Sequence, residues 1–281
     1  MLSSGLRPRV DARTAPLIMG IVNVTPDSFS DGGCFLDPAA ALAHARDLIA
    51  QGADLLDIGG ESTRPRAEPV PADDEIARVI PVIAAIRAES DIPISIDTMK
   101  PAVARAAMAA GATIWNDVMA LTWAQDSLAV AAELGCGVIL MHMRGAPATM
   151  QDDPRYDDVV GEVADYLEQR ARAAMGAGVQ REAIQLDPGI GFGKTAEHSL
   201  TLLAHLDRIV ALGFPVVLGV SRKGFLARID RAAKDAQDRL AGSLAAALAG
   251  ARAGVATLRV HDVRETRQAL AVQAAIEAAR P

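Results

Sequence analysis

Short apolar runs alternate with longer amphipathic segments over most of this chain. Each run is nearly continuous in aliphatic residues, without alternation of apolar and polar positions, which is typical of strands buried on both faces of a parallel sheet. The runs cover residues 17–24, 53–60, 92–98, 112–118, 137–143, 183–189, 215–221 and 255–262. The pattern therefore predicts eight parallel strands.

The segments between the runs have the spacing of amphipathic helices. Segment 37–52 begins with an N-cap aspartate and a proline, carries an apolar stripe and ends at a glycine. Similar stripes run through residues 76–86 and 159–167. These segments predict helices that cover the sheet.

Eight strand–helix units predict a closed barrel, because eight parallel strands are the number that closes one. We expect an α/β protein whose single domain is a (β/α)8 TIM barrel over residues 16–281, preceded by a flexible N-terminal extension of residues 1–15. An open doubly wound sheet is the alternative. It is disfavoured because no GxGxxG motif follows the first predicted strand.

Composition narrows the class of protein further. Hydrophobic residues make up 51% of the chain and the net charge is −7, so a large core is available and no basic field exists to bind nucleic acid. The longest stretches without a charged residue have 13 residues, short of the about 20 that a membrane helix needs. Two widely separated cysteines, Cys34 and Cys136, and the absence of a signal peptide indicate free thiols in the cytoplasm.

Each predicted strand ends in polar side chains at its carboxyl edge. In a barrel these edges gather on one rim, where barrel enzymes place their active sites. One such residue would be an ordinary turn former, but endings of this kind on all the strands predict a polar pocket at the barrel mouth. The polar residues are Asn23, Glu61, Ser62, Thr63, Arg64, Asp97, Asn116, Asp117, His142, Asp187, Ser221, Arg222, Lys223, Arg259 and His261.

The last two strands supply the cations of this pocket, Lys223, Arg259 and His261. Barrels often bind phosphate there, and arginine offers two parallel donors while lysine adds a point charge. A structural pair of Arg259 and His261 that holds the barrel shut is the alternative. Asn23, at the end of the first strand, would offer a neutral oxygen to a hydrated Mg²⁺ shared with phosphates.

The middle strands supply hydrogen-bond acceptors, Asp97, Asn116 and Asp187. A carboxylate can accept two parallel hydrogen bonds from adjacent N–H groups of a planar heterocycle, and the Asn amide also donates. The sequence therefore predicts a heterocycle pocket beside a polyanion pocket.

Three further segments are rich in small residues. Segments 25–33 and 59–69 follow the first two strands and are typical of loops that close over a substrate. Segment 187–195 has three glycines before Lys194 but lacks the spacing of a phosphate-binding P-loop. Segment 261–263 has no second histidine at ligand spacing, which argues against zinc.

Several of these segments together resemble a known family. They are GIVNVTPDSFSDGG (20–33), DIGGESTRP (57–65), SIDT (95–98), LMHMRG (140–145), DPGIGFGKT (187–195), GVSRKG (219–224) and RVHDV (259–263). In this order they resemble the dihydropteroate synthases of bacterial folate synthesis. The resemblance implies a TIM barrel, usually a homodimer, with small-molecule substrates. It also implies that (7,8-dihydropterin-6-yl)methyl diphosphate is joined to 4-aminobenzoate, giving 7,8-dihydropteroate and pyrophosphate.

The resemblance also implies roles for individual residues. Asn23 would be the Mg²⁺ ligand, and Lys223, Arg259 and His261 would be catalytic. The pterin diphosphate site would consist of Thr63, Arg64, Asp97, Asn116, Asp187, Lys223, Arg259 and His261. The 4-aminobenzoate slot would be lined by Phe29, Pro65, Ser221 and Lys223.

The chain departs from the family pattern at a few positions, and two other functions remain as alternatives. Arg66 replaces a common glycine, and Met119 and Trp123 follow the fourth strand, where they affect loop behaviour more than the reaction. A methyltetrahydrofolate:corrinoid methyltransferase would keep the acceptors but has no use for the cations. A non-catalytic pterin-binding paralogue would be expected to have lost a cation or the loop motif.

Overall fold

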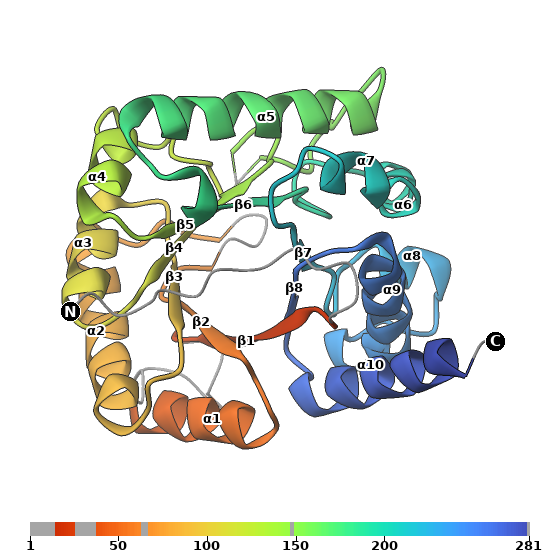
Figure 1. Ribbon diagram of the computed structural model, residues 1–281, viewed down its shortest axis with the longest axis horizontal. Coiled ribbons are helices and arrows are strands. Elements are labelled where there is room, and N and C mark those ends of the chain that lie inside the picture. The colour runs from red at the N-terminus through yellow and green to blue at the C-terminus, as the bar shows by residue number, and fades with distance from the viewer. Residues whose placement is uncertain (1–14, 26–37, 63–66, 147–148, 280–281) are drawn as a thin grey trace.

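Eight parallel strands form the centre of the molecule and helices surround them (Figure 1). The computed structural model describes residues 15–25, 38–62, 67–146 and 149–279. The strands are β1 (Leu17–Asn23), β2 (Leu55–Gly59), β3 (Ile94–Asp97), β4 (Ile114–Asp117), β5 (Gly137–Met141), β6 (Ile184–Asp187), β7 (Val217–Gly219) and β8 (Thr257–Val260). Each lies inside one of the apolar runs, which confirms the predicted strands.

The order of the strands follows the chain around a barrel. Neighbouring strands pair in parallel from β6 through β5, β4, β3, β2 and β1 to β8 and β7. The last step, from β6 to β7, has a single parallel bridge between Leu186 and Val216, with the Leu186 N–H donating to the Pro215 carbonyl at 2.9 Å. The closed barrel is therefore confirmed over the open sheet, and its seam lies between β6 and β7.

Helices follow the strands and form the outer ring (Figure 1). Side-chain N-caps support the starts of α5 and α6; at α5 the Asp158 carboxylate accepts from the N–H groups of Val160 and Gly161. The helices are α1 (Pro38–Ala50), α2 (Ala72–Glu89), α3 (Pro101–Ala109), α4 (Ser127–Leu134), α5 (Val159–Ala177), α6 (Ala196–Ala204), α7 (Leu206–Val210), α8 (Leu226–Ile229), α9 (Leu240–Ala253) and α10 (Val263–Ala278), with short 3₁₀ turns η2 (Arg181–Ala183) and η3 (Ala236–Arg239).

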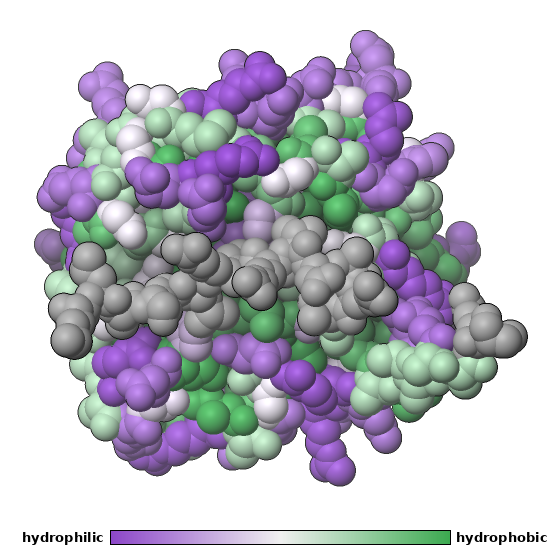
Figure 2. All heavy atoms as spheres, in the orientation of Figure 1, coloured by the Kyte–Doolittle hydropathy of each residue, from purple (hydrophilic) through white to green (hydrophobic). Residues whose placement is uncertain are grey.

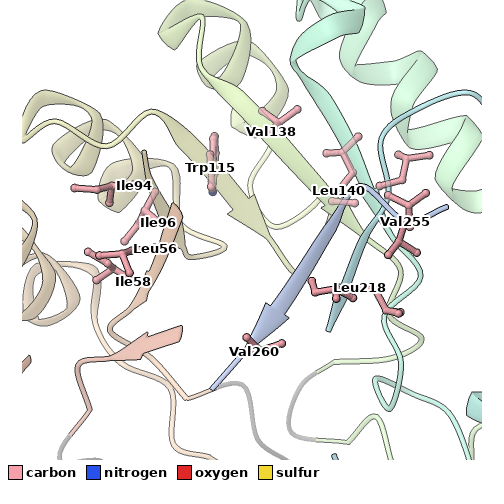
Figure 3. Close-up of a cluster of buried hydrophobic side chains, with 14 of the residues drawn as sticks. Leu56, Ile58, Ile94, Ile96, Trp115, Val138, Leu140, Leu218, Val255 and Val260 are labelled. Atoms are coloured by element: carbon pink, nitrogen blue, oxygen red, sulfur yellow. The ribbon is translucent and has the colours of Figure 1, made fainter. Parts of the chain in front are cut away.

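The outward side chains of the strands pack against this ring. Leu56 and Ile58 of β2, Ile94 and Ile96 of β3 and Trp115 of β4 are among the buried residues of this layer (Figure 3). The Trp115 indole N–H donates to the Thr98 carbonyl at 2.7 Å, so its one polar atom is satisfied. With few aromatic residues available, aliphatic side chains fill most of the layer, as the composition predicts.

The inside of the barrel is divided along its axis into an apolar and a polar part. Met19, Leu55, Ile139 and Val217 form a small apolar cluster in the interior. Asp57 lies two residues after Leu55 on the same strand face, because side chains on a strand alternate. The inward side chains therefore change from apolar to charged toward the carboxyl ends of the strands.

The remaining predictions about organisation have mixed outcomes. Residues 1–14, most of the predicted N-terminal extension, lie outside the described residues, so its flexibility stays a prediction. Cys34 also lies outside them, while Cys136 is a buried free thiol whose pKa burial raises to about 11. Among the described helices, none combines the length and the apolar character needed to cross a lipid bilayer.

Candidate active site

The described site residues gather at the carboxyl ends of the strands. Parallel pairing brings these ends to one rim, so residues far apart in sequence become neighbours. The residues placed there are Asn23 of β1, Asp97 of β3, Asn116 of β4, Asp187 of β6 and Arg259 of β8, with Ser221, Lys223 and His261 just after β7 and β8. Phe29, Thr63, Arg64 and Pro65, and the departure at Arg66, lie outside the described residues.

Arg259 is held by two carboxylates inside the barrel. Its Nε donates to Asp57 Oδ2 at 2.5 Å and one terminal nitrogen donates to Asp97 Oδ2 at 2.7 Å. Burial opposes the charge of this arginine, but Asp57 and Asp97 raise its pKa above the usual range. The structural alternative, a pair of Arg259 with His261, is wrong: the ion pairs of Arg259 are with Asp57 and Asp97.

Asp57 also connects this cation to the heterocycle pocket. Its carboxylate is fully buried, and the Asn116 amide nitrogen lies 3.2 Å from Asp57 Oδ2 and 3.4 Å from Oδ1. The Asn116 nitrogen therefore points toward Asp57, which leaves the amide oxygen as the atom to face a ligand.

Asp97 carries a buried oxygen with no hydrogen-bond partner among the described residues, Oδ1. Burial raises the pKa of this carboxyl to about 7, while the charge of Arg259 opposes that rise and the charge of Asp57 adds to it. A buried acceptor without a partner costs free energy unless a ligand satisfies it. Oδ1 is thus an acceptor available to a ligand N–H group.

Asp187 is the second carboxylate of the pocket and it comes from the opposite side of the barrel. Its Oδ1 accepts from the Gly189 N–H at 2.7 Å, and burial raises its pKa. Gly219 of β7 pairs in register with Arg259, and a Cβ built at Gly219 would lie 4.0 Å from Asp187 Oδ2, an ordinary contact distance.

Lys223 lies on an aromatic ring at the same mouth. Its Nζ is 4.0 Å from the centre of the Phe192 ring, a cation–π contact. Burial lowers the pKa of Lys223 to about 8, while the charge of Asp187 opposes this shift. Lys223 therefore stays mostly protonated at neutral pH but can lose its proton more easily than a surface lysine.

His261 and Ser221 lie together at the β7–β8 side of the rim. The His261 Nδ1 is 3.0 Å from Ser221 Oγ, and the backbone N–H of His261 donates to the same oxygen at 3.2 Å. Burial, followed by the charges of Arg259 and Arg222, lowers the pKa of His261 to about 3. This histidine is neutral at physiological pH, so it can offer a neutral N–H group to an anion but no positive charge.

Two groups of site residues were not predicted from the sequence. Asp57 lies within an apolar run, and a charged residue at an inward position of such a run is the signal that would have found it, because a buried carboxylate requires a partner. The second group is Lys100 and Glu75, which form an ion network with the predicted rim residue Glu61 at the base of loop 59–69. Lys100 Nζ lies 2.6 Å from Glu61 Oε2 and 2.6 Å from Glu75 Oε2.

This network joins three elements near the rim. Glu61 follows β2, Lys100 precedes α3, and Glu75 lies fully buried in the first turn of α2. Burial raises the pKa of Glu75, and the hydrogen bond from Lys100 opposes that rise. Gly60 has no room for a side chain, because a Cβ would lie 2.7 Å from Val79 Cγ1 and 2.9 Å from Glu75 Cγ. The start of the second loop is therefore fixed tightly against α2.

Asn23 is the described candidate for a metal ligand. It is the last residue of β1, half-buried, and pairs in register with Gly59. No cluster of three or more His, Cys, Asp or Glu side chains suited to a metal occurs among the described residues. One amide oxygen fits an ion that keeps most of its water and shares ligand phosphates, which is the behaviour of Mg²⁺.

The site residues can bind a flat heterocycle and a polyanion side by side. Carboxylates and an amide on β3, β4 and β6 can bind the N–H edge of a flat heterocycle, and Lys223 can contact an acceptor on it. Arg259 lies beside this group and can donate to a polyanion from a preformed position. His261 is too weak a base to take up a proton at neutral pH, because burial lowers its pKa to about 3.

Known proteins resemble this chain over nearly its whole length. Residues 19–261 match the family described as pterin binding enzyme. The dihydropteroate synthase of Neisseria meningitidis serogroup C is 48% identical over 258 residues, which cover 91% of this chain and 90% of that protein.

Solved structures agree with this similarity. Xanthomonas albilineans dihydropteroate synthase with 4-aminobenzoic acid has a TM-score of 0.89 and 49% identity, covering 95% of this chain and 94% of that one. The enzyme from the same organism in complex with 7,8-dihydropteroate has a TM-score of 0.85 and 47% identity, covering 95% of each chain.

Proposed function

The chain belongs to the pterin-binding enzyme family, as a dihydropteroate synthase, and we propose that its active site is the barrel mouth around Asp57, Asp97 and Arg259. It is a transferase that joins (7,8-dihydropterin-6-yl)methyl diphosphate to 4-aminobenzoate, with release of pyrophosphate and formation of 7,8-dihydropteroate. This location rests on one observation: the Arg259 side chain donates to Asp57 and to Asp97, so the cation of the polyanion pocket lies beside the acceptors of the heterocycle pocket.

The pterin would be recognised by its amino-pyrimidine edge. Asp187 accepts from that edge, Asp97 offers Oδ1 to a second N–H group, and Asn116 offers its amide oxygen. Lys223 would donate to the pterin carbonyl from its position on the Phe192 ring. Each of these groups is buried or half-buried, so water competes weakly for it.

The reaction would proceed by loss of the leaving group. The bond between the pterin methylene carbon and the diphosphate oxygen breaks, and its electron pair leaves with pyrophosphate. The amine nitrogen of 4-aminobenzoate then forms the new C–N bond and gives up a proton to solvent. The cationic pterin methylene intermediate is stabilised by its own conjugated ring, so the enzyme's main tasks are to hold the two substrates in line and to stabilise the departing anion.

Arg259, His261 and Lys223 would carry out that stabilisation. Arg259 contributes a fixed positive charge and His261 a neutral N–H group. We also propose Thr63 and Arg64 as diphosphate ligands, although they lie outside the described residues. Mg²⁺, held by Asn23 and the diphosphate, would neutralise charge on the departing pyrophosphate when bound.

The 4-aminobenzoate would lie against Ser221 and Lys223. Ser221 is buried and its hydroxyl contacts His261, so the amine slot and the leaving-group site share a wall. Phe29 and Pro65, outside the described residues, would complete the slot. In this proposal the attacking amine would approach the pterin methylene carbon from the side of Ser221.

We propose that the protein is a homodimer formed through α9 and α10. A groove of about 400 Å³ between these helices is lined mainly by apolar side chains, among them Leu244, Leu248, Val272 and Ile276. Val272 and Ile276 are 55% and 58% exposed, and Figure 2 shows a mainly hydrophobic area over α10 at the lower right. Light scattering should give the mass of two chains, and Val272→Glu with Ile276→Glu should give one. Ile229→Glu, on α8, is the matched control, since Ile229 is 61% exposed outside the groove.

We also propose that the protein resides in the cytoplasm. The support is the Cys136 thiol, which is unpaired and buried and therefore suits a reducing compartment. Fractionation of cells that produce the protein, followed by immunodetection, would test this location.

The decisive experiment mixes the protein with Mg²⁺, the pterin diphosphate and 4-aminobenzoate and follows pyrophosphate release. Pyrophosphate release that depends on 4-aminobenzoate supports dihydropteroate synthase activity. Binding of the pterin without release would instead support the non-catalytic paralogue. Transfer of a methyl group from methyltetrahydrofolate to a corrinoid would support the methyltransferase.

A further inference from the structure

Lys194 is a buried lysine to which neither the proposed reaction nor the ligand contacts assign a role. Its side chain is 2% exposed and its Nζ has three neighbouring acceptors. These are His142 Nδ1 at 2.8 Å, the His142 carbonyl at 3.2 Å and the Phe192 carbonyl at 3.0 Å. Burial lowers the pKa of Lys194 to about 7, while the charge of Asp187 opposes this shift. In its ammonium form the lysine has three N–H donors, which match the three acceptors in number.

His142 is suited to accept from this lysine. Burial, followed by the charge of Lys194, lowers the pKa of His142 to about 3, so the ring is neutral and Nδ1 can carry a lone pair. The ring is fixed by an edge-on contact with Tyr166, with the ring centres 4.9 Å apart. Lys194 therefore connects a rigid point at the end of β5 to the segment that follows β6.

The segment after β6 packs directly on this point. Three consecutive carbonyls of residues 191–193 each accept one side-chain hydrogen bond, from Gln151, Lys194 and Tyr156 respectively. Gln151 is exposed and Tyr156 is half-buried, whereas Lys194 is buried, so water can replace the bond from Lys194 least easily. The middle carbonyl, that of Phe192, is therefore the most firmly held.

Phe192 in turn contacts the ligand-binding lysine of the heterocycle pocket. The Phe192 ring lies 4.0 Å from Lys223 Nζ, and the α-carbon of Gly191 faces Lys223 Cδ. The position of Lys223 thus depends on where the backbone of residues 191–192 is fixed. We propose that Lys194 is a positioning residue that, through the Phe192 carbonyl, sets the place of the Phe192 ring and with it of the Lys223 ammonium.

This inference deepens the proposed function and rests on it, because it concerns the residue that would contact the pterin. The variant Lys194→Met keeps the length of the side chain and removes its three donors. Its dissociation constant for the pterin diphosphate, measured by calorimetry without 4-aminobenzoate, should rise about 10-fold, the scale of a lost cation–π contact and a displaced donor. Phe192→Leu should have a similar effect.

A double-mutant cycle separates positioning from loss of stability. If Lys194 acts through Phe192, the combined variant binds no more weakly than the weaker single variant. A merely structural role predicts a lower melting temperature with the dissociation constant of the folded fraction unchanged. Arg170→Met is the matched control, since Arg170 holds another loop of the same rim by donating to the Ala120 and Leu121 carbonyls, and it should leave pterin affinity unchanged.

If Lys194→Met does not fold, His142→Phe removes one acceptor of Lys194 and keeps an aromatic ring beside Tyr166. It should weaken pterin binding about 3-fold, less than the full loss of a charged hydrogen bond, and show the same non-additivity with Phe192→Leu. Unchanged affinity in the folded Lys194 or His142 variant, or additive effects in the cycle, overturns the inference. Wild-type protein that binds the pterin diphosphate but releases no pyrophosphate overturns the proposed function alone.

Discussion

The Nε of Arg259 lies 2.5 Å from Oδ2 of Asp57, a carboxylate with no exposed surface. The two residues are 202 positions apart in the chain and meet because β8 and β2 both neighbour β1 in the barrel. Asp57 therefore fixes the cation of the polyanion pocket while it also contacts Asn116 of the heterocycle pocket.

The first prediction concerns this pair. Arg259→Met leaves Asp57 and Asp97 without their counterion, so we expect a loss of about 3–5 kcal/mol in unfolding free energy, typical of a broken buried pair. Turnover should fall about 10²–10³-fold, because the leaving group loses a preformed donor. Urea unfolding and a pyrophosphate-release assay measure the two effects.

Adding Asp57→Asn to Arg259→Met provides the control. It removes one uncompensated charge, so part of the stability should return while turnover stays low. Recovery of turnover in the double variant would mean that Arg259 serves only to neutralise Asp57.

The second prediction follows from the raised pKa of Asp97, about 7. The carboxylate form accepts hydrogen bonds from the pterin, so affinity should increase as pH rises from 6 to 8, by up to about 10-fold per unit below the pKa. Calorimetric titrations across this range measure it. The dissociation constant of Asp97→Asn should be higher and nearly independent of pH; a wild-type slope retained in that variant would assign the titration to another group.

The same shift affects stability with the opposite sign. The folded protein keeps the Asp97 proton up to about pH 7, whereas the usual pKa is 3.8. The protonated carboxyl therefore stabilises the fold fully below the unfolded pKa, and this contribution is lost as pH rises through 7. As pH rises from 5 to 8, the wild type should therefore lose unfolding free energy relative to Asp97→Asn.

The third prediction concerns the ion network of Lys100. Lys100→Met leaves Glu75 buried without a counterion, and we expect a loss of about 3–5 kcal/mol in unfolding free energy at pH 8. At pH 5 the loss should be smaller, because burial already raises the pKa of Glu75 and the carboxyl then takes up a proton. Urea unfolding at both pH values measures it.

A surface ion pair serves as the comparison for this network. Arg105 and Glu133 lie 2.6 Å apart but are exposed, so Arg105→Met should leave stability nearly unchanged. Glu75→Gln added to Lys100→Met should restore part of the loss. Equal losses in the Lys100 and Arg105 variants would contradict the importance of burial here.

The fourth prediction compares two glycines of the segment after β6. Gly189 has φ +65° and a Cβ there would lie 1.9 Å from the His142 carbonyl oxygen. Gly191 has φ +80° but its nearest neighbour would be Lys223 Cδ at 3.6 Å. Gly191→Ala should therefore cost only the left-handed backbone, about 1–2 kcal/mol, and Gly189→Ala about 4 kcal/mol or more. Thermal unfolding of both variants measures the difference.

Much of the barrel could be predicted from the sequence because its strands are buried on both faces. The run 53–60, for example, predicts β2, and the strand Leu55–Gly59 lies within it. The ends of the strands were predicted less well, since the loops after them form by tertiary contacts. The rim position of Asp97, Asp187 and Arg259 followed from the barrel alone.

The pairing and charge state of the site residues could not be predicted. Asp57 becomes the partner of Arg259 only when the barrel places β8 and β2 on either side of β1, which no local pattern encodes. The neutral state of His261 depends on burial and on Arg259 and Arg222 nearby in space. Lys194 lies in a motif that the sequence shows plainly, but its three acceptors belong to residues brought together by folding.

The barrel has fewer hydrogen bonds between β6 and β7 than between its other neighbouring strands. Within the described part of the chain, the Leu186–Val216 bridge alone joins these strands, whereas the other neighbours share ladders of three or more paired residues. Local opening of the barrel should therefore occur most easily between β6 and β7, and amide hydrogen exchange should be faster there than between β1 and β2. Asp187 lies on one side of this seam and Lys223 and Arg259 on the other. A bound pterin that contacts residues on both sides would oppose separation of β6 and β7. Ligand binding should therefore slow amide hydrogen exchange most at these two strands.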